Sequence, residues 1–150
     1  MTPQLKFCKV ADVKSPTRAH STDAGIDFFV PNDFIETLLK PGCSILIPSG
    51  IKVDVPIGWA LVFFNKSGVA VKKNLLVGAE VVDSGYEGQV HIHLINVGTG
   101  ITTISSGEKI IQGIMLPIGS HFPIETLEED MWKDSKSDRA EGGFGSSGVK

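Results

Sequence analysis

The chain has 150 residues, of which 41% are hydrophobic and 21% charged, and its formal net charge at pH 7 is -3. These values are typical of one globular domain with a sizeable core. No run of lysines and arginines stands out and no apolar run is long enough to span a bilayer, so we expect neither nucleic acid nor a membrane as a partner.

The N-terminus and the cysteines bear on the compartment in which the protein works. Residues 1–6 lack the charged start and apolar stretch of a signal peptide. Cys8 and Cys43 are the only cysteines, and their settings favour two ordinary buried or half-buried thiols over a disulfide framework. We therefore expect a reducing, cytoplasmic location.

Short strand patterns separated by turn residues occupy most of the chain. Alternation of apolar and polar residues predicts strands with one buried side, and prolines and glycines mark the turns between them. The strands that we predict, in chain order, are 5–10, 26–30, 44–48, 51–55, 59–64, 80–82, 90–94 and 109–118. Many short strands at such spacing favour an all-β, barrel or jelly-roll-like fold.

Two positions in the first half of the chain are candidates for chemistry. Asp27, after Ala24-Gly25-Ile26, either has a functional role or ends a turn. A short helix is predicted over 67–73, with Ser67 near its N-cap and lysines in its last turn. Free N–H groups beside Lys66, Ser67 and Gly68 are typical of a phosphate site, although the same residues also fit a simple helix cap.

The segment 81–90 contains two strand-like runs around a turn, which predicts a hairpin. Asp83 ends an apolar run, so its carboxylate would stand at the edge of the core and could orient a water as a general base. An aspartate beside glycines also fits an ordinary turn residue. His91 and His93 share one strand face, which we interpret as solvated, because no further metal ligand lies nearby.

The C-terminal end changes in composition after an acidic connector, 125–138. We expect a β domain over 1–138 and a flexible glycine-rich arm over 139–150. Glycines let backbone N–H groups surround an anion, and Phe144 offers a flat face for stacking on a planar ligand. Further donors suited to phosphate are Arg139, Ser146 and Ser147. A polar terminus without a ligand fits the composition equally well.

Taken in order, five segments resemble the five motifs of the trimeric dUTPase family, and together they span most of the chain. They are 24–27, 66–70, 81–88, 107–112 and 139–148. Each motif is modest evidence by itself, whereas five in the right order, with the last at the terminus, are strong evidence. The resemblance implies a jelly-roll-like β-fold with one short helix and a homotrimer. It also implies an enzyme that hydrolyses dUTP to dUMP and pyrophosphate by water attack on the α-phosphate, which limits uracil incorporation into DNA and supplies dUMP.

The resemblance further implies three active sites, each shared among subunits. One subunit would supply the phosphate-binding motifs around Ser67 and Gln112, a second the turn around Asp83 and Tyr86, and a third its C-terminal arm. In the family, the residue matching Asp83 activates the attacking water, and the one matching Tyr86 packs on the deoxyribose and excludes a 2′-hydroxyl.

The family also implies how the rest of the substrate is held. Phe144 would cover the uracil, Arg139 would reach the outer phosphates, and backbone groups near Val77, Val82 and His91 would read the base. The other substrate-binding residues that the motifs imply are Lys66, Gly68, Val81, Gly145, Ser146 and Ser147. Mg²⁺ would be carried by the triphosphate with no direct protein ligand, Asp27 having at most an indirect role.

Some residues depart from the family's pattern. Lys66 and Lys109 stand where the family usually has arginine, and lysine keeps the charge but loses bidentate geometry. Gly85 stands where the family often has aspartate, which makes Asp83 the clearer candidate base. Two other functions remain open at this point: a dCTP deaminase-like enzyme of the same fold, and a non-catalytic nucleotide-sensing module. The Tyr86 turn and the tail favour phosphate hydrolysis.

Overall fold

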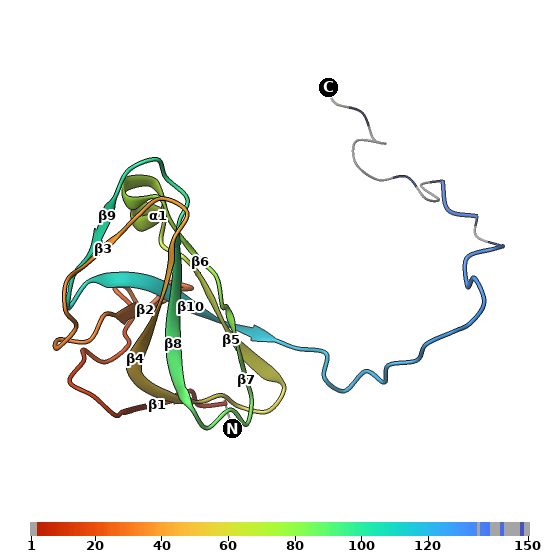
Figure 1. The fold of residues 1–150 in the computed structure, drawn as a ribbon. Coiled ribbons are helices and arrows are strands. Elements are labelled where there is room, and N and C mark those ends of the chain that lie inside the picture. The colour runs from red at the N-terminus through yellow and green to blue at the C-terminus, as the bar shows by residue number, and fades with distance from the viewer. Residues whose placement is uncertain (1–2, 135, 139–141, 143–147, 149–150) are drawn as a thin grey trace. The chain divides into compact units, whose positions relative to one another are not determined.

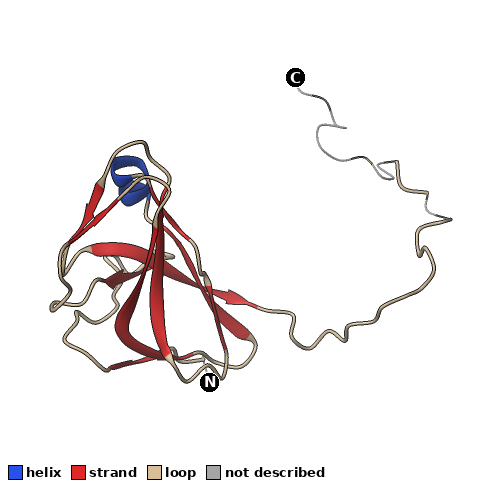
Figure 2. Ribbon diagram, in the orientation of Figure 1, coloured by secondary structure: helices blue, strands red, loops and turns tan. Residues whose placement is uncertain are grey.

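The computed structural model describes residues 3–134, 136–138, 142 and 148, and the chain divides into two units, Met1–Ser120 and His121–Lys150. The first unit holds all helices and strands of the described residues (Figure 2). In the second unit, the described residues between 121 and 138 are exposed and lie outside helices and strands. No helix in the described part of the chain has the length and apolar character needed to cross a membrane.

The strands of the first unit form two four-stranded antiparallel sheets and one two-stranded sheet (Figure 1). The first sheet has the order β1-β4-β8-β6, with bounds Lys6–Lys9, Ser44–Asp54, Gln89–Asn96 and Leu75–Val77. The second has the order β2-β10-β5-β7, with bounds Ile26–Phe29, Lys109–Pro117, Trp59–Asn65 and Val81–Asp83. The third pairs β3 (Thr37–Leu39) with β9 (Thr102–Ile104).

One hydrophobic core serves both larger sheets. In β8 the buried residues alternate with half-buried ones, so Val90, Ile92 and Leu94 face inward. Phe28 of β2 and Phe63 of β5 meet edge to face with ring centroids 4.9 Å apart. The all-β, jelly-roll-like fold with one short helix, α1 (Ser67–Lys73), is confirmed.

Several predicted details were wrong, and each error has a physical reason. The two strands predicted over 44–48 and 51–55 are the single strand β4, because an irregularity in its pairing with β8 between Pro48 and Lys52 lets the strand continue past the proline. Strands β3, β6 and β9 have three residues each, too few to show a period, and were not predicted. Cys8 and Cys43 are exposed free thiols rather than buried ones.

The predicted hairpin over 81–90 was also wrong in its pairing. A turn joins β7 to β8, but β7 pairs with β5 and β8 pairs with β4 and β6, so the two strands belong to different sheets. Their inward side chains, Val82 and Val90, are buried in the shared core. The chain therefore crosses from one sheet to the other at this turn.

Asn96 is a buried polar residue that ties the end of β3 to the loop between β8 and β9. Its Nδ2 atom donates to the carbonyl oxygens of Leu39 and Gly100, each at 2.9 Å, and its Oδ1 accepts from the backbone N–H of Gly98 at 2.9 Å. The residue is 0% exposed, so water cannot replace these partners.

We expect Asn96→Ala to lower the free energy of unfolding by about 2–4 kcal/mol, because it leaves buried polar groups without partners. Urea unfolding followed by fluorescence measures the change. Asn32→Ala is the control: Asn32 is exposed and makes one side-chain hydrogen bond, to Asp12 at 3.1 Å, so its loss should cost under about 1 kcal/mol. Equal effects of the two substitutions would contradict the role given to Asn96.

Candidate functional site

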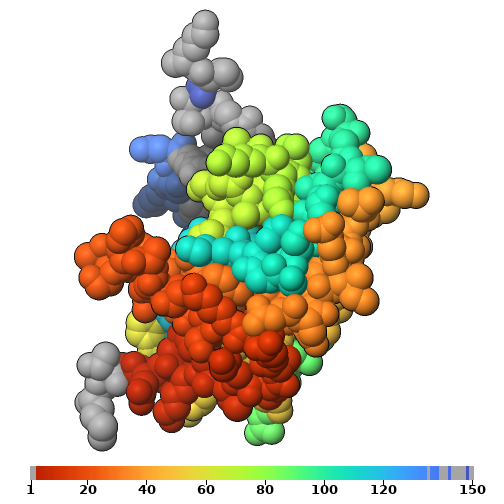
Figure 3. Space-filling view, turned by 90° about the vertical axis from the view of Figure 1, so that its left-hand side faces the viewer, coloured from red at the N-terminus to blue at the C-terminus, as the bar shows by residue number. Residues whose placement is uncertain are grey.

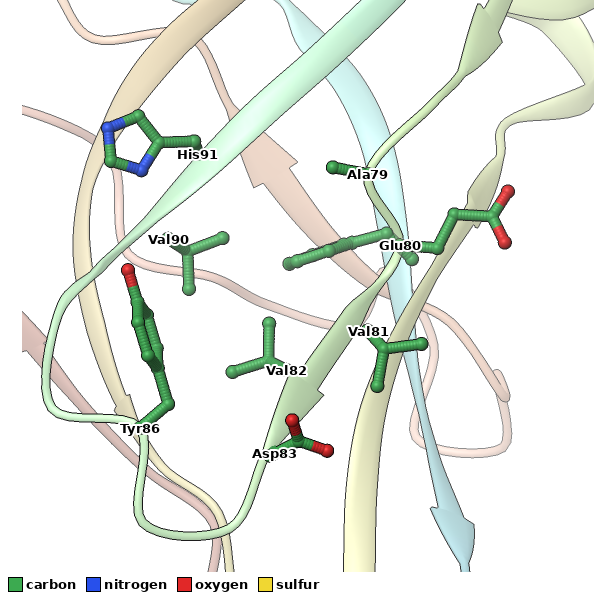
Figure 4. Close-up of a pocket in the computed structure, with 9 residues that line it drawn as sticks. Ala79, Glu80, Val81, Val82, Asp83, Tyr86, Val90 and His91 are labelled. Atoms are coloured by element: carbon green, nitrogen blue, oxygen red, sulfur yellow. The ribbon is translucent and has the colours of Figure 1, made fainter.

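A pocket opens where the chain crosses between the two sheets, and it has a volume of about 200 Å³. Its apolar part is formed by side chains of β5, β7 and β8 (Figure 4). The lining residues are Phe63, Ala79, Glu80, Val81, Val82, Asp83, Tyr86, Val90 and His91. The structure thus brings together five of the residues predicted from the sequence: Val81, Val82, Asp83, Tyr86 and His91. An apolar pocket beside an aromatic ring suits a flat base and a sugar.

Tyr86 and Asp83 stand at the mouth of this pocket. The ring of Tyr86 is 45% exposed, and its hydroxyl donates to the carbonyl oxygen of Gln89 at 3.0 Å. Asp83 is the last residue of β7 and is exposed, and its carbonyl oxygen accepts from the backbone N–H of Tyr86 at 3.2 Å. Asp83 therefore lines the pocket and its carboxylate has access to water, as a general base requires.

A second pocket, of about 380 Å³, lies beside α1 and is rich in lysine. In Figure 3 the yellow-green surface of α1 lies directly against the cyan surface of the segment that leads into β10. The pocket is lined by Lys66, Gly68, Val69, Lys72, Lys73, Glu108 and Lys109. Lys73 is occupied structurally, because its Nζ donates to both carboxylate oxygens of Glu108 at 2.7 Å and to the carbonyl of Thr103 at 2.8 Å. The other lysines leave this pocket with a surplus of positive charge.

Ser67 and Gln112 lie next to the lysine-rich pocket. Ser67 lies near the helix N-cap, as predicted: Lys66 occupies the N-cap with extended backbone angles, and Ser67 is the first helical residue. No side chain makes a cap hydrogen bond. Ser67 is exposed, so its hydroxyl faces solvent rather than the helix end. Gln112, on β10, donates from Nε2 to the carbonyl of Asn65 at 2.8 Å and packs over Gly25.

Asp27 holds two of the lysines by ion pairs. The residue is 4% exposed, Lys66 bonds to its Oδ1, and Lys109 lies 3.0 Å from its Oδ2. Burial by itself would raise the pKa of Asp27, but the hydrogen bonds and positive charges of Lys66 and Lys109 outweigh it and leave the pKa below its ordinary value. The charged carboxylate therefore holds two ammonium groups side by side at the pocket.

Reasoning from sequence did not identify this cluster, although a signal was present. Asp27 lies inside the apolar run of β2, where every residue is buried. A carboxylate in such a run needs a cationic partner, because an unpaired buried charge is costly. The partners, Lys66 and Lys109, lie 39 and 82 positions away along the chain (66 − 27 and 109 − 27), so only the fold could identify them.

One copy of the chain does not bring the two pockets together. Asp83 pairs with Ala60 at the start of β5, whereas Lys66 follows the end of the same strand. Six residue steps along an extended strand, from position 60 to position 66, span about 20 Å. Figure 1 agrees, since α1 and the turn between β7 and β8 lie at opposite ends of the first unit. A phosphate at Lys66 is therefore out of reach of Asp83 of the same copy.

The remaining predicted residues are placed as follows. Val77, on β6, is buried, and its N–H donates to Oδ1 of Asn65 at 2.8 Å; it does not line the pocket that contains Asp83 and Tyr86. Arg139, Phe144, Gly145, Ser146 and Ser147 lie outside the described residues. Among the described residues, no three His, Cys, Asp or Glu side chains are grouped in a way that could hold a metal ion.

Comparison with known proteins identifies a family. A family model described as dUTPase matches residues 11–148. The chain is 35% identical over 139 residues to the deoxyuridine 5′-triphosphate nucleotidohydrolase of Alkaliphilus metalliredigens, covering 91% of each chain. It is also 35% identical over 149 residues to that of Clostridium tetani, covering 98% of this chain and 97% of the relative. Among solved structures, the dUTPase of Staphylococcus bacteriophage 80alpha with dUPNHPP aligns with a TM-score of 0.84 and 28% identity, over 99% and 100% of the two chains.

The ion pairs of Asp27 yield a prediction about stability. Asparagine keeps the shape of the side chain and removes the charge that binds the two ammonium groups. We expect Asp27→Asn to lower the free energy of unfolding by about 1–3 kcal/mol at neutral pH, the usual range for charged hydrogen bonds. The exposed pair of Asp54 with Lys6, at 3.4 Å, offers the control, and Asp54→Asn should change stability little.

The sign of the pH dependence follows from the lowered pKa. A carboxyl group with a folded-state pKa below its ordinary value of 3.8 stabilises the fold above that value, and loses this contribution as pH falls through the folded-state pKa. The difference between wild type and Asp27→Asn should therefore be constant from about pH 5 to 7 and shrink below about pH 4. Chemical unfolding at several pH values tests this, and a difference that stayed the same down to pH 2 would contradict it.

Proposed function

Because the chain belongs to the dUTPase family, it hydrolyses dUTP to dUMP and pyrophosphate, and we propose that it does so in active sites shared between the subunits of a homotrimer. The reaction removes dUTP from the nucleotides available for DNA synthesis and supplies dUMP. The observation that carries the shared site is the distance of about 20 Å that β5 imposes between Asp83 and Lys66. A second copy of the chain supplies the half that one copy lacks.

The outer face of the first sheet offers a surface for this assembly. Leu46 of β4 is 58% exposed, Leu76 of β6 is 37% exposed, and Ile95 of β8 is half-buried between them, paired with Leu76. Apolar side chains in a row across neighbouring strands favour burial against another protein surface. A closed threefold arrangement would cover the same face of each copy and yield three equivalent sites.

The nucleoside half of each site is the pocket at the turn between β7 and β8. The uracil would lie against Val82 and Val90, where backbone groups can match its donors and acceptors. Tyr86 would pack on the deoxyribose and leave no room for a 2′-hydroxyl, which separates dUTP from UTP. Membership of the dUTPase family excludes the dCTP deaminase-like reaction considered from the sequence, since the reacting atom is then phosphorus and not a base carbon.

Asp83 is the proposed catalytic residue. Its carboxylate orients a water molecule and accepts a proton as the water oxygen attacks the α-phosphorus. The bond from the α-phosphorus to the bridging oxygen breaks, and its electron pair leaves with pyrophosphate. The exposed position of Asp83 at the end of β7 supports this role, because the residue lines the pocket proposed for the nucleoside and is open to water.

The triphosphate half of each site comes from a second copy. Lys66 and Lys109, held by Asp27, would face the phosphate oxygens, with Ser67 and Gln112 as uncharged donors. Negative charge increases on pyrophosphate as it leaves, and ammonium groups fixed in advance stabilise that charge without reorganisation. Asp27 would thus act on the substrate through the lysines.

Magnesium would enter this site bound to the triphosphate of the substrate. The two oxygens of Asp27 are taken by Lys66 and Lys109, so in this proposal Asp27 would act on the ion only indirectly. Mg²⁺ prefers phosphate oxygens and water and would neutralise part of the triphosphate charge.

The C-terminal arm of a third copy completes the proposal. By resemblance to the family, residues 139–150 would act as a flexible arm, attached to a β domain that ends at 138. Phe144 would cover the uracil and Arg139 would bind the outer phosphates, and Gly145, Ser146 and Ser147 would add donors. We place the enzyme in the cytoplasm, where a reducing environment suits two exposed free thiols.

We expect Asp83→Asn to lower kcat by about 10² to 10⁴-fold, because asparagine keeps the shape of the side chain but cannot accept the proton of the water. The affinity for a non-hydrolysable dUTP analogue should change little, since the phosphate donors lie elsewhere. Pyrophosphate release and calorimetric titration measure the two quantities. Near-normal turnover would show that another group activates the water.

A mixing experiment tests the shared site directly. Asp83→Asn chains and chains carrying Ser67→Ala with Gln112→Ala should each be poorly active alone. Refolded together at equal concentration, they should recover roughly a quarter of wild-type activity, since about one site in four then combines two intact halves from neighbouring copies. Sedimentation should show a threefold mass in all samples. If mixing never restored activity, each chain would contain a whole site and the shared-site proposal would be wrong.

A further inference from the structure

The ring of Tyr86 is held at its far end by a backbone acceptor. Its hydroxyl donates to the carbonyl oxygen of Gln89 at 3.0 Å, so the side chain folds back across the turn toward the start of β8. In Figure 4 the ring stands beside Val82 and Val90, with its hydroxyl end directed to the side on which His91 lies. Although Tyr86 is 45% exposed, this hydrogen bond gives its side chain one preferred position at the pocket mouth.

The acceptor itself is fixed from two sides. The side chain of Gln89 crosses to the other strand, where its Oε1 accepts from the backbone N–H of Gly50 at 3.0 Å. The carbonyl oxygen of Gln89 also lies 3.1 Å from Nδ1 of His91, and because a carbonyl can only accept, that ring nitrogen carries the hydrogen. Tyr86 thus bonds to an atom whose position is set by β4 and β8 together.

Gly88 makes this position of Tyr86 possible. A Cβ atom at position 88 would lie 2.5 Å from Cζ of Tyr86 and closer still to its hydroxyl oxygen, which real side chains do not allow. Gly88 does not have a positive φ angle, so its backbone would accept an alanine without strain. An alanine at position 88 would therefore force the Tyr86 ring out of this position.

Gly85, in the same turn, differs from Gly88 in both its backbone angle and the space around it. Its φ angle is 86°, in the left-handed region, yet a Cβ atom there would meet nothing within 4 Å. One glycine of the turn therefore allows the backbone bend, and the other allows the aromatic ring to close over it.

We propose that Gly88 is a specificity-determining positioning residue: by having no side chain, it lets the Tyr86 hydroxyl reach the Gln89 carbonyl and so sets the ring where it blocks a 2′-hydroxyl. This inference rests on the role of Tyr86 in sugar selection given under the proposed function. Discrimination between dUTP and UTP then depends on a residue that touches neither the sugar nor the phosphates.

The first test is Gly88→Ala, which displaces the ring without straining the backbone. The ratio of kcat/KM for dUTP to that for UTP should fall roughly tenfold or more, because a misplaced ring loses packing on dUTP and admits UTP. Gly85→Ala is the matched control, which strains the backbone of the same turn and should leave this ratio unchanged. A normal ratio in Gly88→Ala would overturn the inference, as would equal effects of the two substitutions.

Tyr86 variants separate this inference from the role on which it rests. Tyr86→Phe removes the hydroxyl with no added volume and should also lower the ratio, even if Gly88→Ala fails to fold; an unchanged ratio in Tyr86→Phe would overturn the inference. In a Tyr86→Ala background, Gly88→Ala should have no further effect on the ratio, as a double-mutant cycle for coupled residues requires. If Tyr86→Ala itself left the ratio unchanged, the proposed sugar role of Tyr86 would be wrong, and this inference with it.

Discussion

The length of β5 is the constraint on which the organisation of the site depends. This strand pairs with β10 on one side and β7 on the other, so neither of its ends can move independently of the second sheet. Asp83 is registered against its start and Lys66 follows its end, at a separation of about 20 Å. A nucleotide that needs both residues must therefore bridge two copies of the chain. In the proposed homotrimer, the sharing of the site follows from the rigidity of this strand.

The two halves of the proposed site depend on different physical interactions. Around Asp27 the problem is electrostatic: two ammonium groups repel each other, and a buried carboxylate with a lowered pKa keeps both beside the pocket. Where the family usually has arginine, these lysines act as point charges, and their placement depends more on Asp27 than a planar guanidinium would. Around Tyr86 the interaction is steric: the Gln89 carbonyl accepts the hydrogen bond of the tyrosine hydroxyl, and the absence of a side chain at Gly88 leaves room for the ring.

Much of the fold could be predicted because local patterns agree with it. The alternation in β8 and the apolar run of β2 place these strands at nearly the observed bounds, and α1 has the predicted range. The errors occur where the local signal is short or has two meanings. Three-residue strands show no period, and a turn between two apolar runs is the same pattern whether the runs pair with each other, as predicted, or belong to two sheets, as observed.

The sequence by itself determined the all-β class, the order of the motifs and the residue types proposed to carry the chemistry, because these depend on local composition and spacing. A carboxylate at position 83, an aromatic ring at position 86 and lysines at positions 66 and 109 can all be read from the chain. Only the tertiary structure decided which of them meet. Asp27 pairs with Lys66 and Lys109, Tyr86 bonds to the Gln89 carbonyl, and Asp83 lies far from Lys66. Strand pairing sets these distances between residues far apart in the chain, and no local sequence pattern encodes them.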